Sequence, residues 1–267
     1  MSLRSNGSYI GPRPAGPSTS TASGIWDLRT AERQNRNSQW PAFASDTYFA
    51  NVSLLLHMDG SGSTFVDSSA YGRTVTANGD VTQSTSQSKF GGKSAYFDGS
   101  GDWLSTASGS LSLSGDWTIE LWMRPTSLTG TLRTIFHAHA DGARGVHFSH
   151  NGSSLLLDDG TAGDYSAGGI IDADAWQFLS VTKSGSSVYV HKNGTLLTTR
   201  TAGGSGKTYG TPTRIYIARY QDGVSTSGFL GWMDDIRITE GVARYSSASY
   251  TVPTAAFPDA SLPSTGI

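Results

Sequence analysis

The acidic residues of this chain are spaced poorly for acid–base catalysis. A retaining glycoside hydrolase needs two carboxyl groups about 5–5.5 Å apart, and two residues of one strand share a face only at even spacing. Glu120 has no acidic residue two positions away in its predicted strand. Asp234 and Asp235 are adjacent, so an extended strand would point them to opposite faces, and Asp158 and Asp159 have the same defect. We therefore expect a protein that is not an enzyme.

One glycine-rich turn carries the best candidate cation site. The run Asp-Gly-Ser-Gly-Asp places two carboxylates, Asp98 and Asp102, on a single predicted turn. Calcium binds clustered carboxylate and carbonyl oxygens of this kind. Aspartates are also frequent in turns because their side chains accept hydrogen bonds from their own backbone. Both interpretations stay open, and we expect any bound cation to be calcium held near Asp98 and Asp102.

Three histidines form a second candidate metal site. If residues 133–139 pair with residues 145–150 in a hairpin, equal spacing places His139 opposite Gly145 and His137 opposite His147. His137 and His139 share a face because strand side chains alternate, so three imidazoles would meet as transition metals require. A slip of one residue removes this arrangement, and a solvated strand face explains the same residues. We therefore expect calcium at the aspartates rather than a metal at the histidines.

Several aromatic residues are candidates for sugar contacts, because sugars stack on exposed rings while short polar side chains reach their hydroxyl groups. Seven tryptophans cannot all be exposed, so many aromatic side chains belong to the core. The residues that we assign to glycan binding are Trp103, Trp122, Tyr165, Tyr209 and Tyr220.

The overall composition excludes several classes of protein. The chain has no cysteine, which excludes disulfides and cysteine-ligated metal centres. Its net charge of -2 gives no support for nucleic acid or an anionic membrane as a partner. No apolar segment is long enough to cross a bilayer, and the N-terminus lacks the apolar region of a secretion signal. We expect the protein to be made in a cytoplasm.

The hydrophobic pattern indicates an all-β fold. Residues 117–124 alternate between two faces, as do residues 188–191. The pair Asn193-Gly194 follows such a run and predicts a hairpin, and Asn151-Gly152 repeats the signal. Many short strands with regular turns predict a two-sheet antiparallel sandwich. The residues expected to be buried between its sheets are Ile119, Leu121, Val188, Val190, Ile215, Ile217, Ile236 and Ile238.

Residues 1–46 differ from the rest of the chain, which we assign to one domain of residues 47–267. The segment is rich in Pro, Gly and Ser and cannot bury a core of its own. It nevertheless carries apolar and basic side chains of the kind that anchor interfaces. A flexible tail is one interpretation, and an extended N-terminal docking arm is the other. The residues that we assign to partner docking are Trp26, Leu28, Arg29, Arg33 and Trp40.

Two motifs carry a resemblance to a known family. Residues 91–104 read Gly-Gly-Lys-Ser-Ala-Tyr-Phe-Asp-Gly-Ser-Gly-Asp-Trp-Leu, and residues 228–245 include Gly-Trp-Met-Asp-Asp-Ile-Arg-Ile and end in Gly-Val-Ala-Arg-Tyr. Together they resemble the laminin-G-like, concanavalin-A-type jelly roll, over residues 52–259. The Gly-Val-Ala-Arg-Tyr ending is similar to the version found in structural proteins of tailed-phage virions.

This resemblance implies a non-enzymatic structural protein on the exterior of a virion, in a tail, a fibre or a capsid decoration. It implies assembly in the host cytoplasm, with other virion proteins and further copies of the chain as partners in an oligomer. Host-surface glycans are an additional expected contact, and calcium binds at the rim of several domains of this family. Glucanases of the fold use a Glu-x-Asp-x-x-Glu pattern that this chain lacks. The alternative interpretation is a free carbohydrate-binding module or lectin.

Overall fold

The computed structural model describes residues 45–106, 111, 113–129, 132–140, 143–158, 165–201, 212, 214–220 and 227–259. The chain divides into two units, residues 1–44 and 45–267, and every described residue belongs to the second unit. The predicted docking residues, which all lie between positions 26 and 40, are therefore outside the described residues. No helix in the described ranges has the length and apolar character that crossing a membrane requires.

The first of two sheets has β16 near its centre. Its strands follow the order β13-β12-β11-β6-β16-β4-β3, and β1 also pairs with β16, beyond the part that β4 contacts. The strands of this first sheet are β1 (Val52–Leu56), β3 (Thr82–Ser84), β4 (Ser94–Asp98), β6 (Trp117–Pro125), β11 (Gln177–Ser184), β12 (Ser187–Lys192), β13 (Thr195–Thr201) and β16 (Leu230–Glu240). A short 3-10 helix, η1 (Phe49–Asn51), precedes β1.

The second sheet follows the order β10-β9-β8-β7-β14-β5-β2. All its pairings are antiparallel except that the short β15 pairs in parallel with β7. The strands of this second sheet are β2 (Val75–Asn78), β5 (Trp103–Thr106), β7 (Leu132–Ala140), β8 (Ala143–Asn151), β9 (Ser154–Asp158), β10 (Tyr165–Ala167), β14 (Arg214–Ile217) and β15 (Ser227–Gly228).

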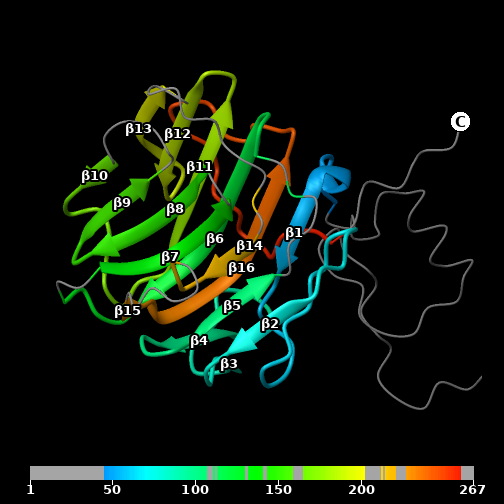
Figure 1. The fold of residues 1–267 in the computed structure, drawn as a ribbon, viewed down its shortest axis with the longest axis vertical. Coiled ribbons are helices and arrows are strands. Elements are labelled where there is room, and N and C mark those ends of the chain that lie inside the picture. The colour runs from blue at the N-terminus through cyan, green and yellow to red at the C-terminus, as the bar shows by residue number, and fades with distance from the viewer. Residues whose placement is uncertain are drawn as a thin grey trace, which may run out of the picture. The chain divides into compact units, whose positions relative to one another are not determined.

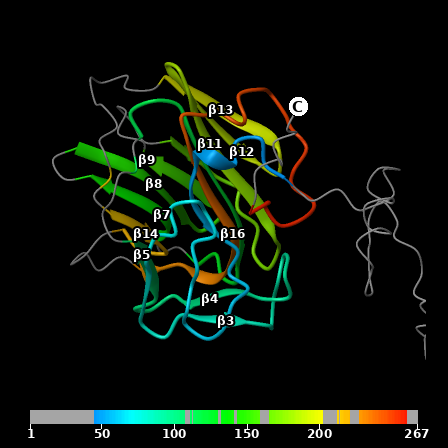
Figure 2. The same ribbon diagram turned by 90° about the vertical axis from the view of Figure 1, so that its right-hand side faces the viewer.

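The main core lies between these two sheets, which form the layers of a sandwich. Figure 1 labels the strands, and the view turned by 90° separates β7, β8 and β9 from β11 and β12 (Figure 2). All eight residues predicted to be buried belong to this core, and none is more than 3% exposed. The predicted all-β, two-sheet antiparallel sandwich is therefore confirmed.

The two predicted hairpins are also present. Lys192 pairs with Thr195, so Asn193 and Gly194 form the whole loop, with positive φ angles of 48° and 76°. That backbone region favours asparagine and glycine. A Cβ atom at Gly194 would lie 2.3 Å from the carbonyl oxygen of Tyr250, so the position also requires glycine for space. In the other hairpin Asn151 still pairs with Ser154, and the loop begins one residue later than the signal suggested.

A second apolar cluster covers the side of the first sheet that faces away from the main core. Its strand residues alternate with core residues, as Leu55 does between Leu54 and Leu56. The orange-to-red segment that follows β16 lies over this side of the sheet (Figure 2) and supplies Tyr245, Tyr250, Val252 and Phe257 to the cluster. The buried residues of the second cluster are Val52, Leu55, Trp122, Phe178 and Phe257.

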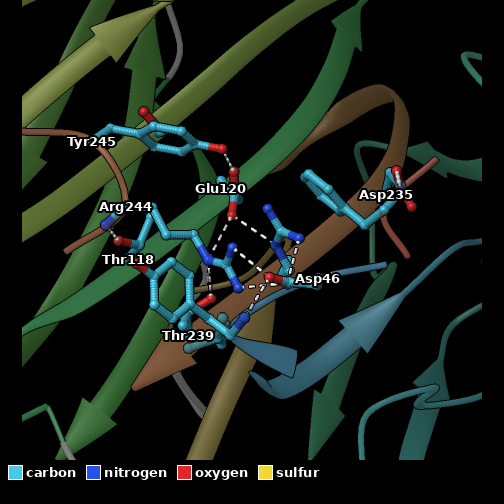
Figure 3. Close-up of polar contacts among 12 residues, drawn as sticks. Asp46, Thr118, Glu120, Asp235, Thr239, Arg244 and Tyr245 are labelled. Carbon is cyan, nitrogen blue, oxygen red and sulfur yellow. Dashed lines mark hydrogen bonds and ion pairs between the residues drawn. The ribbon is translucent and has the colours of Figure 1, made fainter. Parts of the chain in front are cut away.

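A buried ionic network fixes the same segment to the sheet (Figure 3). Glu120 accepts hydrogen bonds from Nε of Arg237 at 2.8 Å and from the hydroxyl of Tyr245 at 2.7 Å. Asp46 accepts two hydrogen bonds from Arg244, at 3.0 and 2.6 Å, and one from Arg237 at 2.9 Å. Arg244 and Tyr245 close the Gly-Val-Ala-Arg-Tyr motif, so this motif is a determinant of the fold.

The network also corrects the predicted domain boundary. Asp46 is buried against Arg237 and Arg244, and the second unit begins at Ser45. Burial opposes ionisation of Asp46, but the hydrogen bonds and charge of Arg244 outweigh it and hold the pKa of this carboxyl below its usual value. Asp46 thus belongs to the sandwich rather than to the preceding arm.

Candidate functional site

A row of polar and aromatic residues crosses the second sheet at one level. Tyr216 on β14 pairs with His137 on β7, His137 pairs with His147 on β8, and His147 pairs with Asp158 on β9. On the other side Tyr216 pairs with Ser105 on β5. Directly paired residues of neighbouring strands point to the same face, so the register gathers these side chains on one surface.

This surface is the side of the second sheet that faces away from the main core. His137 lies between Phe136 and Ala138, which both belong to the core cluster, and Tyr216 lies between Ile215 and Ile217, which do as well. Because strand side chains alternate, the residues between the core positions point outward. Trp103 has the same relation to the buried Leu104.

The rings on this surface contact one another. The ring of Tyr220 is parallel to that of His137, with a centroid distance of 4.5 Å. It also meets the ring of His147 edge-to-face, with a centroid distance of 4.7 Å. His139 lies 5.4 Å from His137, centroid to centroid. The guanidinium of Arg219, the residue before Tyr220, lies 3.9 Å from the ring centre of Trp103. We call this surface the imidazole–aromatic face; it comprises Trp103, His137, His139, His147, Tyr216 and Tyr220.

The centre of the imidazole–aromatic face is buried and its margin is partly exposed. His137, His147 and Tyr216 are buried, whereas Trp103, His139 and Tyr220 are half-buried. Burial, followed by the proximity of His147 and His139, lowers the pKa of His137 to about 3, and burial lowers that of His147 to about 4. Both imidazoles are therefore neutral at neutral pH.

The structure groups only some of the predicted glycan-binding residues. Trp103 and Tyr220 both lie on the imidazole–aromatic face, joined through Arg219. Tyr165 is the first residue of β10, at the edge of the same sheet. Tyr209 lies outside the described residues. The assignment of Trp122 is wrong.

Trp122 belongs to the second apolar cluster, on the other sheet, and only 5% of it is exposed. Its ring packs against Phe90 and Phe178, and the ammonium group of Lys89 lies 3.9 Å from the ring centre. In the sequence Trp122 lies on the strand face opposite to Ile119 and Leu121, and the C-terminal segment covers that face. The ring therefore has no surface for a sugar.

The two predicted metal-ligating aspartates lie together, and a third joins them. Asp80, Asp98 and Asp102 offer carboxylate oxygens that lie within 4.8 Å of one another. Oδ1 of Asp102 accepts a hydrogen bond from the backbone of Asp80 at 2.8 Å, and Oδ2 accepts one from the backbone of Asp98 at 3.1 Å. Burial raises the pKa of Asp102. The turn hydrogen bonds of the alternative interpretation are thus present, and the carboxylate cluster coexists with them.

Three of the acidic residues whose spacing was judged unsuitable for catalysis have structural partners. Glu120 is fully buried in the ionic network (Figure 3). Asp234 accepts hydrogen bonds from the backbone of Lys89 and Phe90, and burial raises its pKa to about 7. Asp235 binds His57 at 2.7 Å and accepts a hydrogen bond from the backbone of Phe257.

The expected opposite orientation of Asp234 and Asp235 is wrong. Asp235 has a φ of 47°, and the pairing of β16 with β6 shifts between Asp234 and Arg237. This bulge breaks the alternation of the strand, so both carboxylates contact residues of the second apolar cluster. The sequence carried no glycine or proline signal for the irregularity.

Three residues of these sites were missed by sequence reasoning. Asp80 is distant in sequence from Asp98, and it joins the carboxylate cluster because Asn78, the last residue of β2, pairs with Trp103 on β5. Tyr216 precedes Ile217 on β14, and Arg219 lies two residues after the end of this strand. Period-two alternation in the sequence assigned only the core residues of β14. A correct β14–β7 pairing would have predicted Tyr216 beside the histidines.

Comparisons with known proteins agree with this architecture. The family model for the "Concanavalin A-like lectin/glucanases superfamily", in its laminin-G version, matches residues 98–244, just over half of the chain. No curated protein is similar enough in sequence to count as a relative.

Several solved structures share the fold at low sequence identity. One comes from work on the dependence of cell entry of botulinum neurotoxin type C on interaction with two ganglioside molecules. It superposes with a TM-score of 0.57 at 17% sequence identity, and the match covers 72% of this chain and 48% of the other. A second is the ligand-binding domain of botulinum neurotoxin serotype D in complex with N-acetylneuraminic acid. It superposes with a TM-score of 0.58 at 14% sequence identity, and the match covers 75% of this chain and 49% of the other. This chain thus spans about half the length of these structures. The match over residues 98–244 and the observed sandwich show that the chain belongs to the concanavalin A-like lectin/glucanase superfamily.

Proposed function

We propose that this protein is a non-catalytic glycan-binding protein whose binding surface is the imidazole–aromatic face. The observation that carries the proposal is the grouping of three partly exposed rings, Trp103, His139 and Tyr220, around buried neutral imidazoles on one sheet face. Sugar rings stack on such surfaces through their C–H groups, and buried neighbours keep the aromatic rings in place.

The polar residues of the same row suit hydroxyl recognition. Ser105 and Asp158 end the row on either side of the rings, and short hydroxyl and carboxylate groups are the partners that sugar hydroxyls need. The neurotoxin domains of the same fold add support, since one was solved with N-acetylneuraminic acid and another is tied to ganglioside interaction. The absence of catalysis rests on Glu120, whose oxygens are occupied by Arg237 and Tyr245.

A glycan array followed by titration of the best ligand tests this proposal. We expect Tyr220→Ala and Trp103→Ala to weaken binding about tenfold each, because one lost stacking contact costs on the order of 1.4 kcal/mol. Tyr71→Ala is the matched control, since Tyr71 is an exposed tyrosine outside the imidazole–aromatic face. Equal losses in all three variants, or binding that survives in both Tyr220→Ala and Trp103→Ala, would place the glycan elsewhere.

We further propose that the protein works on the exterior of a tailed-phage virion, with residues 1–44 as its docking arm. The support is the similarity of the Gly-Val-Ala-Arg-Tyr ending to phage structural proteins and the anchor-rich composition of the arm. Other virion proteins and copies of the chain would be its partners. A free lectin remains the alternative, because the sandwich alone explains glycan binding.

Deleting residues 1–44 distinguishes these two roles. We expect the truncated chain to fold, since the described sandwich begins at Ser45, but to be missing from purified particles when it replaces the full-length protein. Mass spectrometry of the particles gives the readout, and thermal melting of the truncated chain shows that it is folded. Normal incorporation of the truncated chain would contradict the docking role.

Calcium remains a proposal for the carboxylate cluster of Asp80, Asp98 and Asp102. The arrangement supplies three oxygen-bearing side chains on turns at one rim of the sandwich, and calcium prefers ligands of this type. The expected role is to stabilise this turn, because an ion bound only by the folded state raises the melting temperature.

A further inference from the structure

We propose that His137, His139 and His147 form a transition-metal site that binds zinc through three imidazoles. His137 and His139 lie two positions apart on β7, and His147 pairs directly with His137 on the antiparallel neighbour β8. Two histidines at alternate positions of one strand and a third on the adjacent strand place three rings on the same face of the sheet. This proposal does not depend on glycan binding.

Two of the ring-to-ring distances fit such a centre. A zinc ion bonds to imidazole nitrogen at 2.0–2.1 Å with tetrahedral angles, which places the centroids of two ligating rings about 5 Å apart. The centroid of His137 lies 5.4 Å from that of His139 and 5.5 Å from that of His147. His137 is therefore the central ligand. Zinc binding would require the half-buried His139 ring to turn toward His137 and His147.

The polar atoms of the buried rings also point to a missing ligand. Nδ1 of His137 is buried and has no hydrogen-bond partner among the described residues. A buried polar atom without a partner costs about 1–3 kcal/mol, and a metal bond would remove this cost. Nε2 of His147 lies 3.1 Å from Oγ1 of Thr134. When Nε2 donates to this hydroxyl, Nδ1 of His147 carries the lone pair that a metal requires.

The contact with Thr134 is the supporting interaction that metal-bound histidines usually have. The ring nitrogen that does not bind the metal donates to a neighbouring acceptor, which fixes the tautomer and the ring orientation. Asp158 lies on the far side of His147 in the same row, and its negative charge acts on that ring. Thr134 and Asp158 thus provide polar contacts that orient the His147 ring.

The choice of ligand atoms selects the metal. Imidazole nitrogen suits zinc, nickel and copper, whereas calcium needs six or more oxygen ligands. Three protein ligands leave a fourth position for water or another small ligand, as in zinc sites that remain open. From the sequence, calcium at the aspartates was the preferred expectation because the hairpin register was uncertain. The observed pairing of His137 with His147 removes that objection for these two rings, and we assign different metals to the two clusters.

Calorimetric titration of untagged, metal-free protein with zinc chloride tests the proposal. We expect one zinc ion per chain and at least a tenfold loss of affinity in His139→Gln and in His147→Gln. His139 is the more informative position because its side chain is half-buried, so its replacement should leave the fold intact. His150→Gln is the matched control, since His150 lies on the same strand as His147 but hydrogen-bonds to the carbonyl oxygen of Gly152.

Cobalt(II) supplies a second readout that packing alone would not produce. Cobalt in place of zinc should give the intense visible absorption of a tetrahedral site with nitrogen ligands, and His139→Gln should abolish it. Added calcium should leave the cobalt absorption unchanged. The rise in melting temperature that calcium causes should disappear in Asp102→Asn. If zinc binds His139→Gln as tightly as wild type, or if cobalt shows only the weak absorption of an octahedral ion, the cluster is aromatic packing and the proposal is wrong.

Discussion

Replacing Arg237 by methionine should lower the free energy of unfolding by about 3–5 kcal/mol, the usual cost of removing one partner from a buried ion pair. Arg237 is 4% exposed and donates to both Glu120 and Asp46. Methionine keeps most of the apolar stem but removes the guanidinium, which lies 3.8 Å from the ring centre of Phe257. The main effect is therefore two buried carboxylates that lose a shared positive partner. Urea denaturation followed by tryptophan fluorescence measures the change.

Arg124→Met is the control for this prediction. Arg124 forms an ion pair of similar length with Asp174, at 2.7 Å, but the side chain of Asp174 is 63% exposed. Ion pairs at such exposed positions contribute about 0–1 kcal/mol. A loss in Arg237→Met no larger than the loss in Arg124→Met would show that the buried network does not hold the C-terminal segment on the sheet.

Replacing Gly145 by alanine should cost at least about 3 kcal/mol, at the upper end of the cost of overpacking. A Cβ atom at this position would lie 1.4 Å from the carbonyl oxygen of Ala138 and 2.6 Å from its carbonyl carbon. These are backbone atoms, so no side-chain rotation relieves the overlap. Strands β7 and β8 must separate, and this also moves His137 away from His147.

Gly115→Ala is the matched substitution. A Cβ atom at Gly115 would have no described atom within 4 Å, and the residue has no positive φ angle, so the stability of this variant should change by less than about 0.5 kcal/mol. Thermal melting compares the two variants, and zinc titration adds a second readout. Gly145→Ala with wild-type stability would mean that β7 and β8 pair differently around this residue.

The sequence predicted the parts of the fold that depend on local periodicity. Val188 and Val190 alternate with polar neighbours, and Asn193-Gly194 has the backbone preference of a tight hairpin, so these features follow from nearest neighbours alone. Trp122 shows the limit of such reasoning. Its strand face is covered by residues more than a hundred positions away, and no local pattern reports a distant covering segment.

The sequence predicted the candidate sites only where equal spacing across a hairpin was sufficient. His137 and His147 were placed opposite each other by equal spacing, and this pairing is confirmed. The expected pairing of His139 with Gly145 is not among the observed partners, because the register shifts between Ala138 and Ala140. Asp80 and Tyr216 could not be assigned, since each reaches its cluster through a strand pairing that the sequence does not encode locally.

The position of β16 in the first sheet has a consequence for synthesis on the ribosome. This strand lies between β6 and β4 and also pairs with β1, yet it is the last of the described strands to be translated. Until residue 240 has emerged, the nascent first sheet consists of separate pieces whose inner edges have no partner. Exposed strand edges promote association between chains. We therefore expect the growing polypeptide to need protection from association until β16 joins these pieces.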